Sequence, residues 1–571
     1  MGINRSRLLK RIQAARGQIP CDRVLTNAPV FNVFSAEFEK KNLGIYDGTI
    51  VSVTPWDDIP RATEVIDLRD RVIVPGLIDA HVHLESTLLL PNLFEKSVVP
   101  RGTTTAICDP HEIANVMGTQ GISYFCDVAE ELSMDLRIMV PSCVPATHLE
   151  TNGAGILSAG DLAPFQKRTK VLGLAEVMNV PAVINGDPAM FDKLEAFDGF
   201  PLDGHAPQLH GNDLSAYLVA GIQTCHESCE LSEAREKLEK GMAVWIREGS
   251  VAKDLDALMP LISLRTSTSL GFCTDDRNPI EIQEQGHLDY LVRECLRRDY
   301  DPAAVFRASS WSVARLYGLD RGIDRIGAIA PGYRADLLVL GDVKSLAIDR
   351  VMVRGRWNSE IQWIDSSHVE PLRGNSMRCA KVTENDLKGP TGSVHVIRVI
   401  PGKIVTEHLV AGSESNGIYR MSVIERHGQK TVPANGYVTG FGNAMRGAIA
   451  TSVGHDSHNL AVVGSDLKSM TTAANALIES GGGFCVARGG DVLSLLPLPI
   501  AGLMTETSAQ DVVQKMNELR RASHEIGCEL DEPFLQLAFL SLPVIPKLKL
   551  TNLGLVDVEK FELIPVAAQQ N

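Results

Sequence analysis

Two histidines, His81 and His83, stand one residue apart at the end of an apolar run that begins at Val72. Because side chains alternate across a β-strand, both project to the same face, about 7 Å apart along the backbone. Imidazole nitrogen atoms at that spacing are able to bind one metal ion together. The pair therefore indicates a metal-assisted hydrolase.

The segments around this pair predict a parallel βα fold. From residue 72 onward, short β-rich runs alternate with helical patterns such as residues 232–240, which Gly241 closes as a C-cap. Eight such runs are present, at residues 72–81, 103–109, 136–146, 171–179, 201–206, 223–227, 243–248 and 269–275. Eight β/α units over about 250 residues match a TIM barrel in number and size.

Barrel enzymes place their chemistry at the carboxyl ends of the strands. Six of the eight predicted strands end in side chains that bind metals or transfer protons: His81 and His83, Asp109 and His111, Glu176, His205, His226, and Asp275 with Asp276. Any one of these could be a hydrogen-bonded residue of the core or of a loop. Together they indicate one site at one end of the barrel.

The flanking segments predict two further units. The fold class we expect is α/β: a (β/α)8 TIM-like barrel, a small β-sandwich domain formed by the segments that flank it, and a C-terminal α+β domain. The expected bounds are 1–21 for an N-terminal helical extension, 22–71 and 323–372 for the sandwich, 72–322 for the barrel and 376–571 for the C-terminal domain, with a linker at 370–376.

Composition limits the partners. The 55 Lys and Arg against 70 Asp and Glu give a formal charge of -15, which argues against nucleic acid and anionic membranes and favours a small neutral or cationic substrate. The longest apolar tract, residues 492–505, is 14 residues long with two prolines, too short to cross a bilayer. Eleven cysteines scattered through apolar segments predict buried thiols in a reducing compartment, the cytoplasm.

Several motifs are similar to those of a known family. The segment Pro-Gly-Leu-Ile-Asp-Ala-His-Val-His at 75–83, the Asp of strand eight and Pro-Gly-Tyr-Arg-Ala-Asp-Leu at 331–337 resemble the amidohydrolase superfamily. A narrower resemblance, to bacterial adenine deaminases, rests on residues 83–87, 108–112, 203–207, 273–276 and 454–459 (His-Leu-Glu-Ser-Thr, Cys-Asp-Pro-His-Glu, Asp-Gly-His-Ala-Pro, Cys-Thr-Asp-Asp, Gly-His-Asp-Ser-His-Asn). The resemblance covers nearly the whole chain.

This resemblance implies conversion of adenine and water to hypoxanthine and ammonia at a binuclear metal site. It implies that His81 and His83 bind one ion, that His205 and His226 bind the other, that Glu176 bridges both, and that Asp275 completes the shell of the first ion. Iron(II) or manganese(II) is the expected metal, with zinc(II) as the alternative, because the oxygen and imidazole ligands do not choose among the three. A homo-oligomer, a dimer or larger, is a further family expectation.

The remaining candidates have less definite roles. Asp275 is the expected first acceptor of a proton from the attacking water, and Glu176, Asp276 and Asp109 complete the catalytic set. We expect a substrate-binding role for Glu85, His111, His455 and His458, although the two C-terminal histidines could equally serve local hydrogen bonds in a glycine-started turn. Cys225 and Cys229 flank His226, and packing is the better interpretation of both.

Three alternatives compete with this hypothesis. A zinc deaminase of the nucleobase-editing kind needs a Pro-Cys-x-x-Cys segment after its His-x-Glu, and none follows His83-Leu-Glu85. Another binuclear amidohydrolase, acting on a cyclic amide or a different aminopurine, would use the same barrel motifs. A non-catalytic protein on the same scaffold would be expected to have lost ligands, and all six expected ligand positions are occupied.

Overall fold

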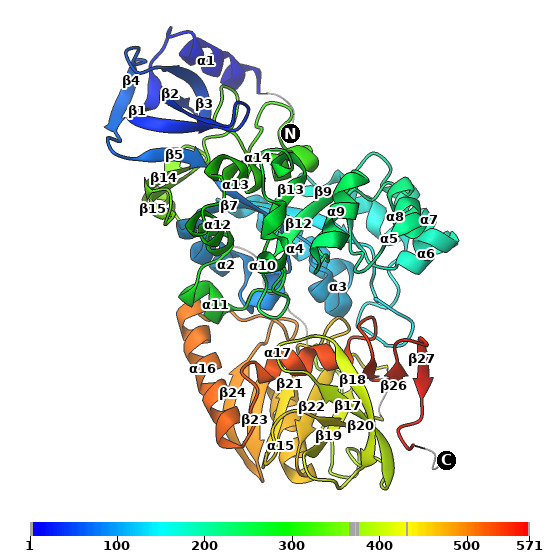
Figure 1. The fold of residues 1–571 in the computed structure, drawn as a ribbon. Coiled ribbons are helices and arrows are strands. Elements are labelled where there is room, and N and C mark those ends of the chain that lie inside the picture. The colour runs from blue at the N-terminus through cyan, green and yellow to red at the C-terminus, as the bar shows by residue number, and fades with distance from the viewer. Residues whose placement is uncertain (1–3, 365–371, 373–375, 430–431, 569–571) are drawn as a thin grey trace.

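The computed structural model describes residues 4–364, 372, 376–429 and 432–568. Three units follow one another along the long axis of the molecule: a small sheet, a barrel and a C-terminal domain, with the barrel in the middle (Figure 1). Most of the predicted linker at 370–376 lies outside the described residues. No helix in the described ranges is long and apolar enough to cross a membrane.

The two segments that flank the barrel in sequence join in one eight-stranded sheet. Strand β5 before the barrel pairs antiparallel with β14 after it. The long strand β1 pairs with β4 through its first half and with β5 near its end, so the sheet forks there. Its elements are α1 (Arg5–Ala15), β1 (Cys21–Asn32), β2 (Glu37–Tyr46), β3 (Thr49–Pro55), β4 (Ala62–Asp67), β5 (Val72–Pro75), β14 (Leu337–Asp342), β15 (Ala347–Val353) and β16 (Arg356–Trp357).

The predicted first barrel strand, residues 72–81, is in fact two strands. Residues 72–75 belong to the small sheet, and β6 of the barrel begins at Leu77. The backbone changes hydrogen-bond partners at Gly76. The N–H of Gly76 donates to the backbone carbonyl oxygen of Asp336, whereas the N–H of Leu77 donates to that of Gly102. A side chain at position 76 would collide with Thr104, so glycine allows the close passage from one sheet to the other.

The eight predicted barrel strands are present as one parallel sheet, in the order β6 to β13. Val82 and Asp275 form a parallel bridge that closes the barrel between its first and last strands. Several strands end before their predicted limits, because the residues beyond those ends form the loops at the barrel mouth. The bounds are β6 (Leu77–Val82), β7 (Thr103–Cys108), β8 (Asp135–Pro141), β9 (Val171–Val177), β10 (Leu202–Gly204), β11 (Thr224–Cys225), β12 (Ala243–Arg247) and β13 (Leu270–Cys273).

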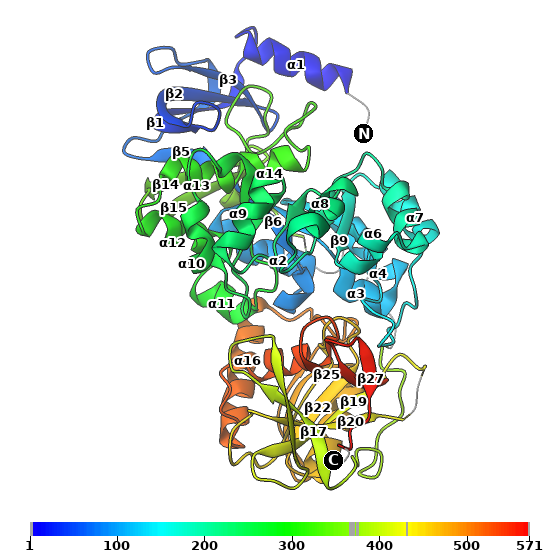
Figure 2. The same cartoon turned by 45° about the vertical axis from the view of Figure 1, so that its right-hand side comes forward.

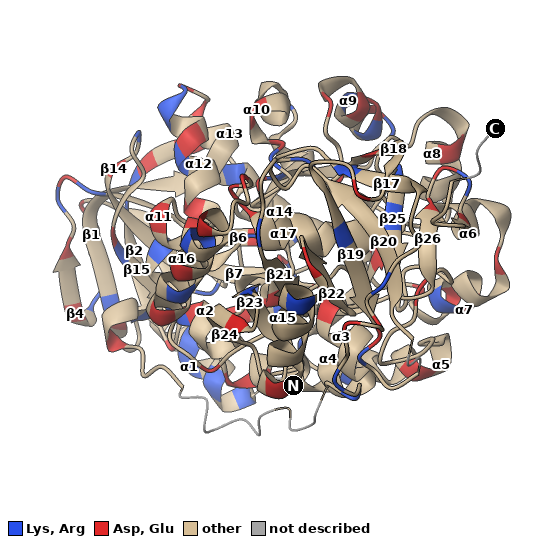
Figure 3. Cartoon of the chain, turned by 90° about the horizontal axis from the view of Figure 1, so that it is seen from below, with Lys and Arg blue, Asp and Glu red and all other residues tan. Residues whose placement is uncertain are grey.

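Helices surround the barrel, and charged residues of both signs are mixed on their outer surfaces (Figure 3). The predicted helix at 232–240 is α9, and Gly241 follows it with a φ of +90°. The helices are α2 (Pro91–Val98), α3 (His111–Met117), α4 (Thr119–Glu131), α5 (Ala159–Leu162), α6 (Val180–Asn185), α7 (Pro188–Ala196), α8 (Gly211–Val219), α9 (Leu231–Glu239), α10 (Leu255–Leu258), α11 (Pro279–Glu284), α12 (Leu288–Arg297), α13 (Pro302–Ala308) and α14 (Trp311–Leu316).

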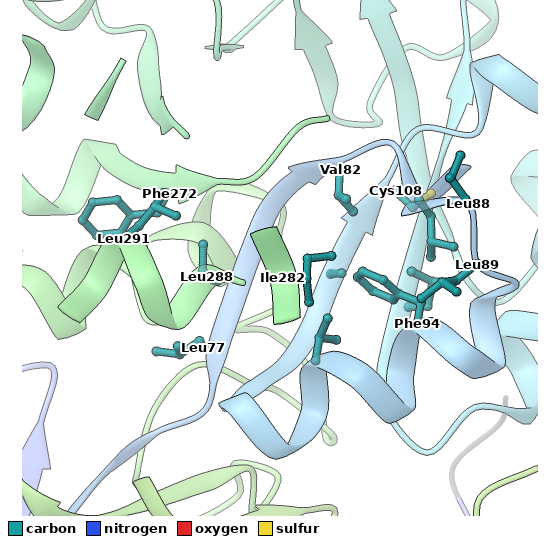
Figure 4. Close-up of a cluster of buried hydrophobic side chains, with 14 of the residues drawn as sticks. Leu77, Val82, Leu88, Leu89, Phe94, Cys108, Phe272, Ile282, Leu288 and Leu291 are labelled. Atoms are coloured by element: carbon teal, nitrogen blue, oxygen red, sulfur yellow. The ribbon is translucent and has the colours of Figure 1, made fainter. Parts of the chain in front are cut away.

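A buried apolar cluster fixes the strand that carries the two histidines. Val82, which stands between them in sequence, is fully buried and lies beside β7 with Ile282 of α11 and Phe94 of α2 in the same cluster (Figure 4). Because successive side chains point to opposite sides of a strand, burial of Val82 on the outside directs His81 and His83 away from this cluster.

The C-terminal domain is an α+β unit built on an eight-stranded sheet. Helix α15 packs on one face, and α16 and α17 pack on the other. On that side α16 also contacts α2 and α11 of the barrel, and Figure 2 shows α16 next to α11. The bounds are β17 (Ser393–Val399), β18 (Thr406–Gly412), β19 (Ile418–Ile424), β20 (Ala434–Thr439), β21 (Ala448–Thr451), β22 (Leu460–Gly464), α15 (Leu467–Ser480), β23 (Gly483–Arg488), β24 (Asp491–Pro497), α16 (Ala509–Glu525), α17 (Pro533–Ala538), β25 (Leu548–Thr551), β26 (Gly554–Asp557) and β27 (Glu562–Ile564).

Candidate metal centre

The first group of predicted ligands converges at the mouth of the barrel. The Nε2 atoms of His81 and His83 lie 3.1 Å apart, and each lies 2.9 Å from Oε1 of Glu176. Oδ1 of Asp275 lies 3.1 Å from Nε2 of His83 and 3.8 Å from Nε2 of His81. All four side chains are buried. Strands β6, β9 and β13 thus bring three predicted strand ends to one point.

The second group gathers around the other oxygen of Glu176. Oε2 of Glu176 lies 2.6 Å from Nδ1 of His205 and 3.6 Å from Nε2 of His226. Oε1 of Glu227 lies 3.6 Å and 3.5 Å from the same two nitrogen atoms. Glu176 therefore stands between two histidine pairs, with one oxygen directed at each pair, and Glu227 adds a carboxylate that the sequence analysis did not identify.

The hydrogen bonds of the ring nitrogen atoms test whether this group suits a metal ion. Nδ1 of His83 lies 3.0 Å from the backbone carbonyl oxygen of Asp109, which only accepts, so the hydrogen of the neutral ring is on Nδ1. Nδ1 of His81 similarly faces Oδ2 of Asp203 at 3.0 Å. Their Nε2 lone pairs then face the oxygen of Glu176, an arrangement that a cation between them stabilises. The residues present fit a metal centre.

The charges of the group point the same way. Burial disfavours the charged form of His81, yet the carboxylates of Glu176 and Asp203 outweigh it and raise the pKa of the imidazole to about 10, so positive charge is favoured beside Nε2, either as a proton or as a metal ion that takes its place. Burial would likewise raise the pKa of Asp275, but His83 and Arg247 lower it well below its usual value. Nη1 of Arg247 lies 3.1 Å from Oδ2 of Asp275, leaving Oδ1 directed at the histidines. Deeply buried carboxylates therefore remain ionised beside imidazoles.

The remaining barrel candidates surround the first histidine pair. Oδ2 of Asp109 lies 3.3 Å from Nδ1 of His111, whose ring centroid is 4.4 Å from that of His83. Asp276 accepts a hydrogen bond from the hydroxyl of Ser86. Oε1 of Glu85 accepts from the backbone N–H of Ile113 at 3.0 Å, and burial, reinforced by the charge of Glu112, raises the pKa of the Glu85 carboxyl to about 7.

The C-terminal loop between β21 and β22 reaches the same mouth. Nδ1 of His455 lies 2.5 Å from Oε1 of Glu112, and Nε2 of His458 contacts the other oxygen of Glu112. His458 also makes a local bond, because its Nδ1 accepts from the N–H of Gly454 at 3.2 Å. The loop therefore bonds within itself and also across the interface to the barrel.

Five polar residues at the mouth were not identified as site residues from the sequence: Glu112, Asp203, Glu227, Arg247 and Asp456. Glu112, Asp203 and Asp456 stand inside motifs that were recognised, one or two residues from a named candidate. Arg247 ends the seventh barrel strand, one of two strands for which no polar end residue was considered. Position at a strand end was thus a usable signal for Arg247.

The cysteines beside His226 take no part in the candidate metal groups of the described residues. Cys225 is buried, and Nζ of Lys237 lies 3.4 Å from its sulfur, while Cys229 is exposed. Packing accounts for Cys225, in agreement with its interpretation from the sequence, whereas the exposed side chain of Cys229 does not fit the packing role expected for it.

Comparisons with known proteins place both large units in families. Residues 72–358 match the model of the amidohydrolase family, and residues 400–562 match that of the adenine deaminase C-terminal domain. Adenine deaminase 1 of Rhizobium johnstonii is 47% identical over 98% of this chain and 99% of that protein. The adenine deaminase of Brucella abortus is 45% identical over 97% and 96%, and that of Cereibacter sphaeroides 47% identical over 97% and 99%.

Proposed function

This chain belongs to the adenine deaminase family, and we propose that it hydrolyses adenine to hypoxanthine and ammonia. It is a hydrolase of the C–N bond of a cyclic amidine. One observation carries the proposal beyond the family: Glu176 directs one oxygen at His81 and His83 and the other at His205, as a carboxylate between two metal ions would.

We propose that this centre holds two divalent ions, iron(II) or manganese(II), with zinc(II) as the alternative. His81, His83 and Asp275 would hold the first, His205 and His226 the second, and Glu176 would bridge them. When bound, such a pair lowers the pKa of a shared water and supplies hydroxide at neutral pH. The Nε2 lone pairs of His81 and His83 support this assignment. So does the burial of the Glu176 and Asp275 carboxylates, which are shielded from water.

Carboxyl groups at the mouth of the barrel would carry out the proton transfers. Oxygen adds to C6 of adenine and a proton to N1, and the bond from C6 to the exocyclic nitrogen then breaks as that nitrogen takes up a second proton and leaves as ammonia. Asp275 would receive the proton of the water, because its free oxygen Oδ1 is directed into the ligand group. Asp276 and Asp109 are our candidates for delivering protons to N1 and to the leaving amine.

A cavity between the barrel and the C-terminal domain supports a flat, largely apolar substrate. Its walls include Leu88, Phe484 and Phe534, and also Ser86 and His455, which contact the acidic residues of the mouth. We propose that the purine is bound where this cavity meets the mouth. Glu85, His111, His455 and His458 are our candidates for its recognition, and Oε2 of Glu85 is buried without a hydrogen-bond partner among the described residues.

The competing candidate is another amidohydrolase activity on the same metal pair, toward a cyclic amide or a different aminopurine. Ammonia release from adenine, adenosine and guanine, and ring opening of cyclic amides, measured with the manganese(II)- or iron(II)-loaded enzyme, separates the two. We expect turnover of adenine well above all others. No turnover of adenine by protein that holds two ions per chain would overturn the proposed substrate.

We further propose that the enzyme acts in the cytoplasm as a homo-oligomer. All eleven cysteines are free thiols, which supports a reducing compartment. The oligomer rests on the family resemblance, and light scattering of the metal-loaded protein tests it: a mass of one 62.0 kDa chain at micromolar concentration would exclude it.

A further inference from the structure

We propose a third cation site, outside the two-ion centre, at the contact between the barrel and the C-terminal domain. His111 and Glu112 at the start of α3 supply ligands from the barrel, and His455 and Asp456 supply ligands from the loop between β21 and β22. The mixture of carboxylate oxygen and imidazole nitrogen suits a divalent transition-metal cation such as manganese(II).

Three of the ligand atoms, from His111, Glu112 and Asp456, lie within 4.8 Å of one another, and Nδ1 of His455 approaches the oxygens of Glu112 and Asp456. Nε2 of His111 lies 3.6 Å from Oε1 of Glu112 and 3.8 Å from Oδ1 of Asp456. Nδ1 of His455 lies 2.5 Å from the same oxygen of Glu112 and 3.9 Å from the same oxygen of Asp456. Ligand atoms about 2.1 Å from a tetrahedral ion are separated by roughly 3.4 Å, so the three longer separations suit a shared ion, whereas the contact between His455 and Glu112 would have to widen by about 0.9 Å.

The tautomer of His111 leaves a lone pair in this space. Nδ1 of His111 faces Oδ2 of Asp109 at 3.3 Å, so the hydrogen of the neutral ring is on Nδ1. Nε2 then directs a lone pair toward the oxygens of Glu112 and Asp456. His83 in the two-ion centre shows the same arrangement, with its hydrogen directed at an acceptor and its Nε2 directed at carboxylate oxygen.

His458 differs, which excludes it from the ligand set. Its Nδ1 accepts from the backbone N–H of Gly454, so the hydrogen of its neutral ring is on Nε2, the atom that contacts Glu112. We therefore assign His458 to holding Glu112 in place. Glu112 itself is 1% exposed, and neither of its oxygens has an aligned hydrogen-bond donor among the described residues.

The balance of charge around the site favours a bound cation. Among the described residues, no Lys or Arg forms an ion pair with the carboxylates that meet here, Glu85, Glu112, Glu150, Asp276 and Asp456. Within those described residues, Glu112 and Asp456 form ion pairs only with histidines. Buried carboxylates whose only ion-pair partners are imidazoles need either protonated rings or another cation beside them, and a divalent ion supplies that charge while the rings stay neutral.

Such an ion would join the two large units of the chain at the barrel mouth. His111 and Glu112 are neighbours in sequence, and so are His455 and Asp456. More than three hundred residues separate the first pair from the second. His111 and His455 would then act at the mouth through the ion rather than by direct contact with the purine.

Metal analysis and anomalous diffraction test the site directly. The full chain, stripped of metal, is loaded with manganese(II), freed of excess ion and measured for metal per chain. We expect three ions in the wild type, two in Asp456→Asn and three in Asp213→Asn, a control at an exposed aspartate of α8. Crystals of the same wild-type protein should give a manganese anomalous peak between Glu112 and Asp456.

Two ions per chain in the wild type, with no anomalous peak between Glu112 and Asp456, would overturn the proposal even if Asp456→Asn fails to fold. That result would leave the two-ion centre intact, because both ions would then lie between His81 and His226. Fewer than two ions at that centre would instead contradict the proposed function. In His226→Ala we expect the peak at Glu112 and Asp456 to remain while one catalytic peak is lost.

Discussion

Arg247 holds one oxygen of Asp275 through its Nη1 atom at 3.1 Å and leaves the other oxygen directed at His81 and His83. The guanidinium also contacts Asp254 and Glu227, and all four side chains are at least nine-tenths buried. Arg247 therefore links the carboxylate that we propose as first proton acceptor to the second group of ligands. It is a positioning residue.

Replacing Arg247 with Met should leave three buried carboxylates without their cation. Removing one partner of a buried ion pair typically destabilises a protein by about 3–5 kcal/mol, so we expect the free energy of unfolding to fall by an amount in that range. Arg247→Lys should recover part of the loss because the charge is retained. Urea unfolding of the three proteins at pH 7 measures this, and equal midpoints for wild type and Arg247→Met would contradict the role.

Asp203 fixes the ring of His81 through a 3.0 Å contact with its Nδ1 atom. Loss of such a partner of a metal-binding histidine typically costs about 10–100-fold in metal affinity or activity. Asp203→Asn should therefore bind manganese(II) about 10–100-fold more weakly, because the amide no longer favours the hydrogen on Nδ1 as strongly. Competition with a chromophoric chelator gives the affinity. An unchanged dissociation constant would show that His81 is oriented by other contacts.

Glu176→Gln should lose activity by at least about 100-fold, because the neutral amide presents one oxygen where the carboxylate presents two. We also expect the centre between His81 and His226 to hold fewer than two ions. Glu195→Gln, the same replacement at an exposed position of α7, serves as the control and should behave as wild type. Full activity in Glu176→Gln, with both ions still present between His81 and His226, would refute the bridging assignment.

Stability should depend on pH through Glu95 of α2, away from the site. Burial is the main reason why the pKa of its carboxyl is raised from 4.5 to about 7. The folded state therefore binds more protons than the unfolded chain between these values, and its free energy of unfolding falls as pH rises from 4.5 to 7. Glu95→Gln does not titrate, so it should match wild type near pH 4.5 and be about 1–3 kcal/mol more stable at pH 8.

Thermal or urea unfolding of both proteins across this pH range checks the prediction. Because the amide keeps an oxygen for the 3.0 Å bond from the N–H of Met134, the replacement retains the main contact of Glu95. A difference between the two proteins that stays constant from pH 4.5 to pH 8 would mean that Glu95 does not titrate in this window.

The barrel and its candidate site residues were accessible to sequence analysis because both depend on local patterns. Alternating β and helical runs give the eight strands, and polar residues at strand ends give His81, Glu176 and Asp275 without knowledge of any contact. The fold class, the family and the deaminase reaction are confirmed by the comparisons and the topology.

What sequence analysis missed depends on contacts between distant segments. The interaction of Glu112 with His455 joins residues 343 positions apart, and no local pattern specifies such a pairing. The break at Gly76 also depends on tertiary structure, since residues 72–81 form one continuous β-like run whose hydrogen-bond partners change midway. Arg247 was overlooked because a lone arginine at a strand end has many common structural roles.

The pairing of β5 with β14 has a consequence for synthesis on the ribosome. Pro75 and Leu337 are partners in this ladder, and 262 residues separate them (337 minus 75). At about 5–20 residues per second, a ribosome needs roughly 13–50 s to make that interval. Throughout this time the edge of β5 that β14 will cover is open to other chains, while all eight barrel strands emerge. A nascent chain truncated before residue 337 would thus contain all eight barrel strands but lack β14, β15 and β16 of the small sheet.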